Sequence, residues 1–365
     1  MNRLQLFMYV IFFLYHSLWA QETHDKWIVV TTINYPTKVM QNIKALHQFI
    51  EQNDWHLVVV ADKKTPQDWD LPHCDYLSVE KQQELGYRIC NLLPWNHYAR
   101  KNIGYLYAIE HGAKIIYDTD DDNILMSKEI PFYPENTNML AYQTDETVIN
   151  PYIYFGHPSI WPRGYPLEKI QAPALYTFEH KQVRPLVQQY LVDGDPDVDG
   201  IYRLTRGIPY VSFLQKPAVC VPEGTFCPYN SQGTMYHFDA FWGLVIPITT
   251  TFRVCDIWRG YWVQRLLWDI NGGISFLPPA IVQERNAHNY FKDFIDELDL
   301  YTKSGELVNF LKNWQSNERD LVHRIMALTQ DMISQEYYKE AEAIFMQAWL
   351  DDLKDIGYQF PALLK

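Results

Sequence analysis

The sequence predicts an α/β protein in which a mostly parallel sheet is sandwiched by helices. Short apolar, β-branched segments, which are typical of buried strands, alternate with segments of helical periodicity. Such alternation predicts strand–helix–strand units and therefore parallel pairing. Toward the C-terminus the pattern becomes helical throughout, which predicts a helical appendage.

Four strands and two helices are expected in the first third of the chain. The strands are residues 27–33, 56–61, 74–79 and 115–117. The first helix spans residues 36–50 and begins with Pro36, a residue favoured in the first turn of a helix. The second helix spans residues 98–111 and ends at Gly112.

These patterns divide the chain into three regions. Residues 1–20 are an N-terminal apolar segment, residues 26–290 are the body that carries the sheet, and residues 300–365 are a helical extension. Within the body, residues 131–233 are rich in Pro, Tyr and Gly, which predicts loops and short strands. The extension is most simply a packing appendage or a partner surface.

The acidic stretch Lys114–Asn123, K-I-I-Y-D-T-D-D-D-N, is the most informative motif. It places four carboxylates directly after a predicted strand, those of Asp118, Asp120, Asp121 and Asp122. Burying so much negative charge is costly unless a cation neutralises it. Mg²⁺ and Mn²⁺ prefer oxygen ligands and commonly link one or two carboxylates to substrate phosphates. The motif therefore predicts a metal–diphosphate site, with a solvated acidic turn as the alternative.

Polar residues also follow the first two strands. Thr31, Thr32 and Asn34 close the first strand, and Asp62 closes the second. In open parallel sheets ligands bind beyond the carboxyl ends of the strands. We therefore expect these side chains and the acidic stretch to meet at one edge of the sheet.

A second candidate lies in residues 255–268, C-D-I-W-R-G-Y-W-V-Q-R-L-L-W. Its acid, Asp256, suits general-base work. Arg259, Gln264 and Arg265 suit contact with a donor phosphate or sugar. The alternative is an amphipathic helix whose tryptophans belong to the core. The two interpretations are compatible if one face of the helix packs in the core while the other lines a cleft.

Two weaker candidates flank these motifs. Arg100, Lys101 and Asn102 lie at the start of a predicted helix, where backbone N–H groups and basic side chains favour anions. A solvated basic helix start is the alternative. His237 and Asp239 are spaced to share one face of a strand.

Residues 193–200, D-G-D-P-D-V-D-G, match the first half of a calcium-binding EF-hand loop. Arg206 stands where that motif needs a bidentate glutamate, so an EF-hand is rejected. The remaining interpretations are an acidic turn or a loop that contacts acceptor hydroxyls, with Asp199 as a further candidate acid.

Composition restricts partners and compartment. The net charge of −13 argues against nucleic-acid binding, which depends on Lys and Arg. Arg3 followed by an apolar run that ends at Ala20 predicts a secretory signal, or alternatively a short uncleaved anchor that attaches the protein to a membrane. The body is then expected in the secretory pathway, in a Golgi-type lumen, the periplasm or the extracellular space.

The five cysteines do not form a Cys-x-x-Cys pair, which argues against a zinc site. In an oxidising compartment Cys220 and Cys227 are candidates for a disulfide, and Cys74 with Cys90 for a second, leaving Cys255 free. Sequence alone does not fix this connectivity.

Taken together, several of these motifs resemble the STELLO-type glycosyltransferases. They are residues 100–123, residues 193–206 and residues 252–268, with T-T-I-N-Y-P-T at 31–37 and V-A-D-K-K-T-P at 60–66. The resemblance covers about Lys26 to Glu284. It implies a GT-A-like nucleotide-sugar fold for residues 26–290, in which an Asp-x-Asp motif binds a divalent metal, Mn²⁺ or Mg²⁺, and the donor diphosphate.

By this resemblance Asp120 and Asp122 are the metal-binding pair, with Asp118 or Asp121 in support. The resemblance also places Asp62 near the base or ribose. The donor-side candidates are Thr32, Asn34, Asp62, Arg100, Lys101, Asn102, Asp118, Asp121, Arg259, Gln264 and Arg265.

The main hypothesis is a metal-dependent glycosyltransferase that moves a sugar from a nucleotide-diphosphate donor, by default a UDP-sugar, to a glycan or protein acceptor. Asp256, or else Asp239 or Asp199, takes the acceptor proton if the reaction inverts. The STELLO resemblance also implies an alternative, a non-catalytic lumenal scaffold for a polysaccharide-synthesising complex. A phosphohydrolase of the haloacid-dehalogenase type ranks last, because Asp122 stands where that motif has Thr or Val.

Overall fold

The computed structural model describes residues 24–35, 54–71, 74–127, 129–172, 176–207, 210–283 and 289–364. The N-terminal apolar segment and the expected helix over 36–50 lie outside these residues. None of the helices in the described part of the chain is long and apolar enough to cross a membrane.

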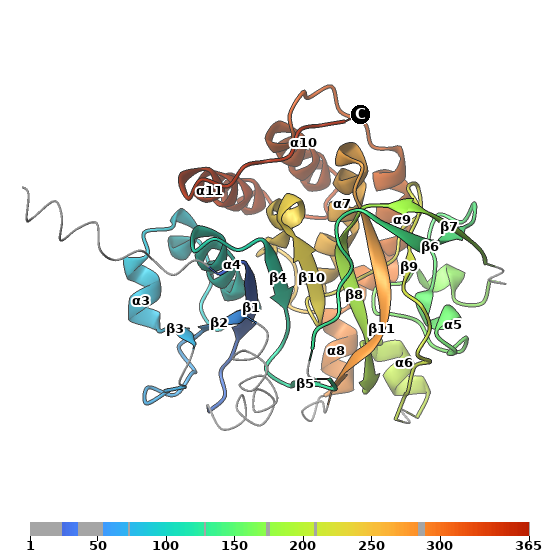
Figure 1. Ribbon diagram of the computed structural model, residues 1–365, viewed down its shortest axis with the longest axis horizontal. Coiled ribbons are helices and arrows are strands. Elements are labelled where there is room, and N and C mark those ends of the chain that lie inside the picture. The colour runs from blue at the N-terminus through green and yellow to red at the C-terminus, as the bar shows by residue number, and fades with distance from the viewer. Residues whose placement is uncertain are drawn as a thin grey trace, which may run out of the picture.

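One large mixed sheet organises the chain (Figure 1). Its strands are β1 (Lys26–Thr31), β2 (Trp55–Val60), β3 (Asp75–Leu77), β4 (Ile115–Asp118), β5 (Asn123–Leu125), β6 (Thr137–Gln143), β7 (Thr177–Val183), β8 (Pro185–Gly194), β9 (Val219–Cys220), β10 (Thr234–His237) and β11 (Gly273–Gln283). Their order is β3-β2-β1-β4-β10-β8-β11-β9-β6-β7, and β5 pairs with β11.

Helices follow or cover these strands. The α-helices are α3 (Val79–Glu84), α4 (Lys101–Glu110), α5 (Pro151–Tyr154), α6 (Gly200–Thr205), α7 (Cys255–Leu267), α8 (Tyr290–Asp296), α9 (Leu298–Asn313), α10 (Leu321–Ser334) and α11 (Ala341–Asp355). Short 3₁₀ helices are η1 (Arg88–Asn91), η2 (Tyr98–Arg100), η3 (Leu167–Lys169), η4 (Phe238–Leu244) and η5 (Trp268–Ile270).

The four expected strands are confirmed as β1 to β4, with ends shifted by at most two residues. They form the parallel part of the sheet, in which β1 pairs with β2 and β4, and β2 pairs with β3. The α/β class and the C-terminal helical part are confirmed as well, and the arrangement is consistent with a GT-A-like fold. Beyond β4 the pairing is mixed, because β10 runs antiparallel to both β4 and β8.

Strand β8 was not expected from the sequence. All ten of its residues are buried, including Gln188 and Gln189, whose polarity interrupts the apolar pattern of a strand. The Gln188 amide exchanges hydrogen bonds with the backbone of Tyr133, and the Gln189 amide bonds the backbone of Asn230 and Gln232. These contacts satisfy polar groups that would be costly to bury unpaired.

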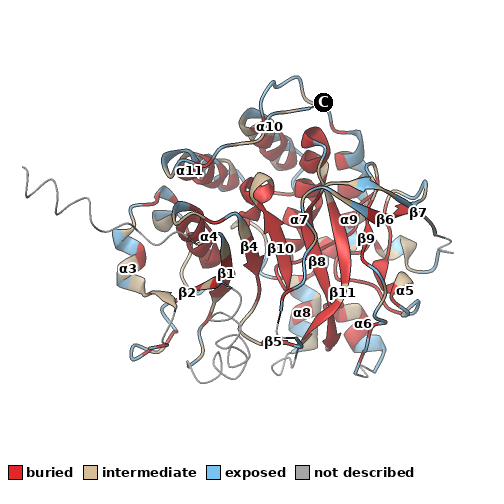
Figure 2. Cartoon of the chain, in the orientation of Figure 1, coloured by how far each residue is buried: buried red, intermediate tan, exposed pale blue. Residues whose placement is uncertain are grey.

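Buried residues form two cores, and because their side chains alternate along β1 the cores lie on opposite faces of the sheet. Figure 2 shows that the central strands are largely buried. The larger core receives side chains from α4, α7 and the C-terminal helices. Neither expected disulfide forms, and all five cysteines are free. Cys220 and Cys74 belong to the smaller core whereas Cys227 and Cys90 belong to the larger one, so the sheet separates the partners of both expected pairs.

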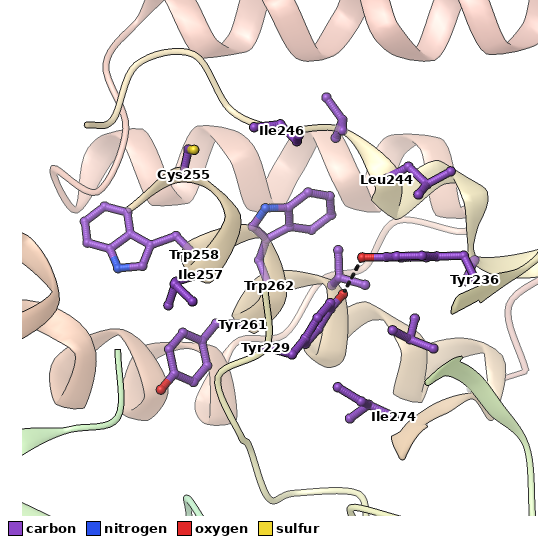
Figure 3. Close-up of a cluster of buried hydrophobic side chains, with 14 of the residues drawn as sticks. Tyr229, Tyr236, Leu244, Ile246, Cys255, Ile257, Trp258, Tyr261, Trp262 and Ile274 are labelled. Atoms are coloured by element: carbon purple, nitrogen blue, oxygen red, sulfur yellow. Dashed lines mark hydrogen bonds between the residues drawn. The ribbon is translucent and has the colours of Figure 1, made fainter. Parts of the chain in front are cut away.

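Helix α7 is the centre of the larger core (Figure 3). Trp258 and Trp262 are almost fully buried, which confirms the core interpretation for these two tryptophans. The helix approaches the chain at Tyr229 so closely that a Cβ atom on Gly260 would lie 2.6 Å from the Tyr229 carbonyl oxygen. Glycine at this position therefore lets α7 and the segment that follows Tyr229 meet, and both carry residues of the site below.

The C-terminal helices pack onto the body. Trp349 of α11 donates its indole N–H to the Trp242 carbonyl at 3.0 Å. The buried carboxylate of Asp352 accepts the backbone N–H groups of Arg88 and Ile89 at 2.9 and 3.0 Å. The extension therefore fixes η1, a segment more than 250 residues away in sequence.

We expect Asp352→Ala to lower the free energy of unfolding by about 2 to 4 kcal/mol, because the buried Ile89 N–H and the partly buried Arg88 N–H lose their acceptor. Urea denaturation measures this change. Its matched control is Asp351→Ala on the same helix, where the side chain is 36% exposed and the expected change is within about 0.5 kcal/mol. Equal effects of the two substitutions would show that the Asp352 contacts do not contribute to the free energy of unfolding.

Candidate functional site

A cavity of about 450 Å³ opens beyond the carboxyl ends of β1, β2 and β4. Parallel pairing places these ends at one edge, with Val29 of β1 opposite Asp118 of β4. Of the sequence-predicted residues, the structure brings eight into the cavity wall: Thr31, Thr32, Asn34, Asp62, Asp120, Asp121, Asp122 and Asp256.

The acidic stretch forms one wall of this cavity, and each of its three cavity-lining carboxylates has a different partner. Asp121 accepts hydrogen bonds from the Thr32 hydroxyl at 2.5 Å and the Asn34 amide at 2.7 Å. Asp122 accepts from the Gln283 amide at 3.0 Å. The partners of Asp120 are an ammonium group and a phenol.

Asp120 contacts both an ammonium and a phenol. Its Oδ1 lies 3.2 Å from Lys101 Nζ and accepts the Tyr98 hydroxyl at 2.9 Å. Burial raises the pKa of Asp120 to about 7, and the charges of Asp122 and Asp118 also raise it, against the lowering effect of Lys101 and Tyr98. A cation at this wall would therefore relieve an unfavourable accumulation of negative charge.

Asp118 lies behind the wall and does not line the cavity. Its carboxylate is fully buried, 2.5 Å from Lys101 Nζ and 3.6 Å from Arg259 Nη1. Lys101 and Arg259 are also fully buried, so neither reaches the cavity. These three predicted donor-side residues form a charged layer beneath the site.

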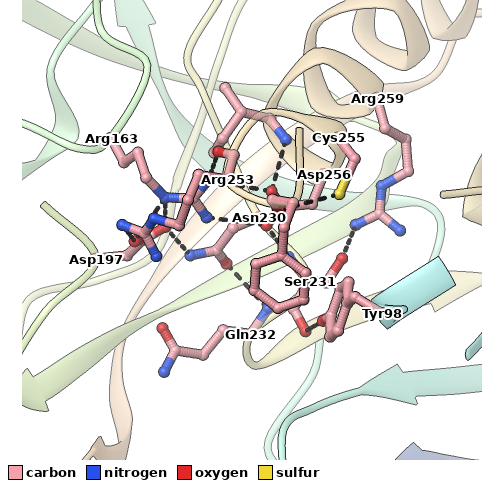
Figure 4. A network of polar contacts seen from close by, with 12 residues as sticks. Tyr98, Arg163, Asp197, Asn230, Ser231, Gln232, Arg253, Cys255, Asp256 and Arg259 are labelled. Carbon is pink, nitrogen blue, oxygen red and sulfur yellow. Dashed lines mark hydrogen bonds and ion pairs between the residues drawn. The ribbon is translucent and has the colours of Figure 1, made fainter. Parts of the chain in front are cut away.

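Another part of the cavity wall is a network built on the Arg163 guanidinium (Figure 4). Arg163 Nε donates to Asp197 at 2.8 Å, and its Nη1 and Nη2 donate to the two carboxylate oxygens of Asp256 at 3.2 and 3.0 Å. The Asn230 amide donates to Asp197 at 2.7 Å. Arg253 adds a further cation, which pairs with Glu297 at 2.6 Å.

Asp62 lines the cavity, but its carboxylate accepts hydrogen bonds from backbone N–H groups. One oxygen accepts the N–H groups of Lys63 and Asn96 at 2.6 and 2.8 Å, and the other accepts the His97 N–H at 3.0 Å. Only 4% of Asp62 is exposed. Its observed contacts hold the loop that precedes Tyr98.

Four other predicted donor-side residues do not line the cavity. Arg100 bonds the Gln82 amide and stacks on Trp95, and the Asn102 amide pairs with the Ile246 backbone. The Gln264 amide pairs with the backbone of Cys227, and Arg265 contacts Trp314 and Asp269. These polar side chains link elements of the fold instead.

Two candidate acids are likewise placed elsewhere. Asp199 caps α6 and accepts the Trp161 indole N–H at 2.6 Å. Asp239 lies in η4 and not on the strand with His237, and its carboxylate pairs with Arg184. Of the three acids proposed as a base, Asp256 alone lines the cavity.

Sequence reasoning missed about half of the lining. The missed side chains are Lys64, Asn96, His97, Tyr98, Arg163, Asp197, Asn230, Gln232, Phe252, Arg253 and Gln283. Asp197, Phe252 and Arg253 lie within motifs that had been singled out, so their neighbours were a usable signal. Arg163 and Asn230 carry no such signal, because long-range contacts alone define their roles.

With every carboxylate counted as ionised, the formal charges that line the cavity sum to −3, from six aspartates against Lys64, Arg163 and Arg253. His97 adds no charge near pH 7, since burial lowers its pKa. Within the described residues no cluster of three or more His, Cys, Asp or Glu side chains is arranged as a complete metal site. Asp120 and Asp122 present carboxylate oxygens at the cavity wall, and a divalent ion held by these two alone would need substrate phosphates or water as further ligands.

Comparison with known proteins identifies relatives. Residues 253–365 match the family model described as STELLO glycosyltransferases, a match that includes the C-terminal extension. Two proteins of Arabidopsis thaliana, "Probable glycosyltransferase STELLO1" and "Probable glycosyltransferase STELLO2", are 35% and 36% identical over 370 residues, covering 95% of this chain. They match over 47% of their own length, so the chain spans about half the length of these curated relatives.

One solved structure, titled "Crystal Structure of a Mycobacterial Protein", aligns with 83% of this chain and 79% of that chain. The identity is 9% and the TM-score 0.37, a similarity too low to indicate a function.

Proposed function

Because the chain belongs to the STELLO glycosyltransferase family, we propose that it is a metal-dependent glycosyltransferase. It moves a sugar from a nucleotide-diphosphate donor, by default a UDP-sugar, to a glycan or another hydroxyl acceptor. The observation that carries this proposal is the cavity at the carboxyl ends of β1, β2 and β4, whose lining has a formal net charge of −3. A diphosphate is itself an anion, so it needs a cation to bind there.

Asp120 and Asp122 would hold the cation, and Asp121 would keep the turn in place through Thr32 and Asn34. When bound, Mn²⁺ or Mg²⁺ would neutralise the charge that develops on the departing nucleoside diphosphate. The buried ammonium of Lys101 compensates the charge of Asp118 and also contacts Asp120. One ammonium cannot neutralise all of these carboxylates, so negative charge remains at the cavity surface.

The second wall supplies the acceptor side. Asp256 would take the proton of the acceptor hydroxyl if the reaction inverts, and Arg163 holds that carboxylate by both oxygens. Phe252, with 53% of its surface exposed, offers an aromatic face at the same cavity. Asp199 and Asp239 drop out of this role because neither reaches the cavity.

We also propose that the N-terminal apolar segment directs the body into the secretory pathway, as a cleaved signal or as a membrane attachment. Expression of the full chain and sequencing of the secreted N-terminus test this. A mature protein that begins near residue 21 identifies a signal peptide, whereas retention of the intact segment in a membrane fraction identifies an anchor.

Thermal shift with Mn²⁺ and a panel of UDP, GDP, CDP and their sugars tests the donor site. We expect one nucleotide to raise the melting temperature only when Mn²⁺ is present, because a ligand bound to the folded state stabilises it. Asp145→Asn is the control, since that carboxylate is exposed and remote from the cavity wall. No shift with any nucleotide in a folded protein would contradict the proposal and favour the scaffold hypothesis.

A further inference from the structure

Tyr98 joins the acidic wall to the loop that precedes α4. Its hydroxyl lies 2.9 Å from Asp120 Oδ1 and 3.3 Å from Lys101 Nζ. The Ser231 carbonyl, at 3.5 Å, is a second acceptor within reach. A carboxylate at the shorter distance is the stronger acceptor, so the single hydroxyl proton is directed to Asp120 while Lys101 donates to the oxygen.

Two contacts restrain Tyr98, one through the backbone and one on the ring. His97 Nδ1 accepts the Ala99 N–H at 3.1 Å and so caps η2, in which Tyr98 is the first residue. Phe252 packs edge-on against the Tyr98 ring at a centroid distance of 5.5 Å. The phenol therefore reaches Asp120 from a constrained position, which is the condition for a side chain to orient a ligand.

Asp62 holds the start of this loop. Its two oxygens accept the N–H groups of Asn96 and His97. Asn96 has a φ angle of 54°, a left-handed conformation that is sparsely populated without support. An almost fully buried carboxylate that accepts three backbone N–H bonds is committed to that support, although its position at the cavity wall would also suit contact with a nucleoside.

We propose that Tyr98 is a positioning residue for the metal-binding carboxylate Asp120, and that Asp62 acts through Tyr98 by holding its loop. The inference rests on the proposed function, because it presupposes that Asp120 binds a metal. Groups that hydrogen-bond metal ligands fix ligand orientation, and their loss typically costs 10- to 100-fold in metal affinity. Asp62 thereby receives a role other than contact with the base or ribose.

Calorimetric titration of Mn²⁺ alone, without nucleotide, tests the proposal. Tyr98→Phe keeps the ring and removes only the hydroxyl, and we expect its Mn²⁺ affinity to fall by about 10-fold. Tyr87→Phe is the matched control, because the Tyr87 hydroxyl also bonds a carboxylate, that of Glu110, away from the cavity wall. Its Mn²⁺ affinity should equal that of the wild type.

Asp62→Asn separates the two possible roles of Asp62. A positioning role predicts weaker binding of Mn²⁺ alone, and no further loss when Asp62→Asn is added to Tyr98→Phe. A nucleoside contact predicts unchanged Mn²⁺ binding with weaker UDP binding, which would overturn the Asp62 assignment. Wild-type Mn²⁺ affinity in Tyr98→Phe would overturn the Tyr98 assignment, whereas absence of Mn²⁺ binding in the wild type both without and with UDP would overturn the metal site itself and this inference with it.

Discussion

Asp120→Asn and Asp122→Asn should each reduce sugar transfer by at least about 100-fold, the scale seen when one group that stabilises transition-state charge is removed. The amide keeps the size of the carboxylate but loses the charge that a divalent ion needs. Both side chains line the cavity, so the loss acts where the diphosphate would lie. Turnover of the donor sugar measures the rate, and calorimetry with Mn²⁺ and the nucleotide measures binding.

The fold should survive these substitutions. Burial and the neighbouring charges of Asp122 and Asp118 raise the pKa of Asp120, so a neutral group at position 120 removes a repulsion from the metal-free protein. We therefore expect an unchanged or slightly higher melting temperature in Asp120→Asn without metal. Mn²⁺-dependent nucleotide binding of wild-type strength in both variants would exclude this pair as the metal ligands.

Asp121→Asn is an informative companion to these two variants. The Asp121 carboxylate accepts two hydrogen bonds from Thr32 and Asn34, so its role in the proposal is to hold the turn. We expect a smaller loss of Mn²⁺ affinity than for Asp120→Asn. A larger loss of Mn²⁺ affinity would indicate that Asp121 is a metal ligand.

Local patterns were sufficient to predict the parallel part of the sheet. The segments that became β1, β2 and β4 are β-branched and apolar, and polar residues follow each of them. Because parallel strands place their carboxyl ends at one edge, Thr32, Asp62 and the acidic turn could be expected together before any contact was known. That prediction uses only strand direction, which the strand–helix alternation supplies.

Sequence patterns did not distinguish polar side chains that line the cavity from those that link buried elements. Arg100, Gln264 and Arg265 have the residue types of a donor site, but each bonds groups within the fold. Arg163 and Asn230 look unremarkable in sequence, although they join Asp197 and Asp256 across the cavity wall. The difference depends on partners 33 to 93 residues away, which no local window contains.

Replacing Lys101 with methionine should destabilise the metal-free protein by about 3 to 5 kcal/mol, because it leaves a buried charge uncompensated. Lys101 is 2.5 Å from Asp118, and both side chains are fully buried. Arg259 remains at 3.6 Å from Asp118 and compensates only part of its charge. Urea denaturation measures the change, with Lys312→Met, an exposed lysine, as a control expected to change stability by less than about 1 kcal/mol.

A double variant shows whether the cost comes from the ion pair or from lost packing. If Lys101 serves to compensate Asp118, then Lys101→Met combined with Asp118→Leu removes both charges and should cost less than the sum of the two single substitutions. Additive effects would mean that each side chain acts independently of the other. A coupled pair would instead show that a buried ion pair of Lys101 and Asp118 supports the acidic turn, which leaves Asp120 and Asp122 as the carboxylates that face the cavity and attract a cation.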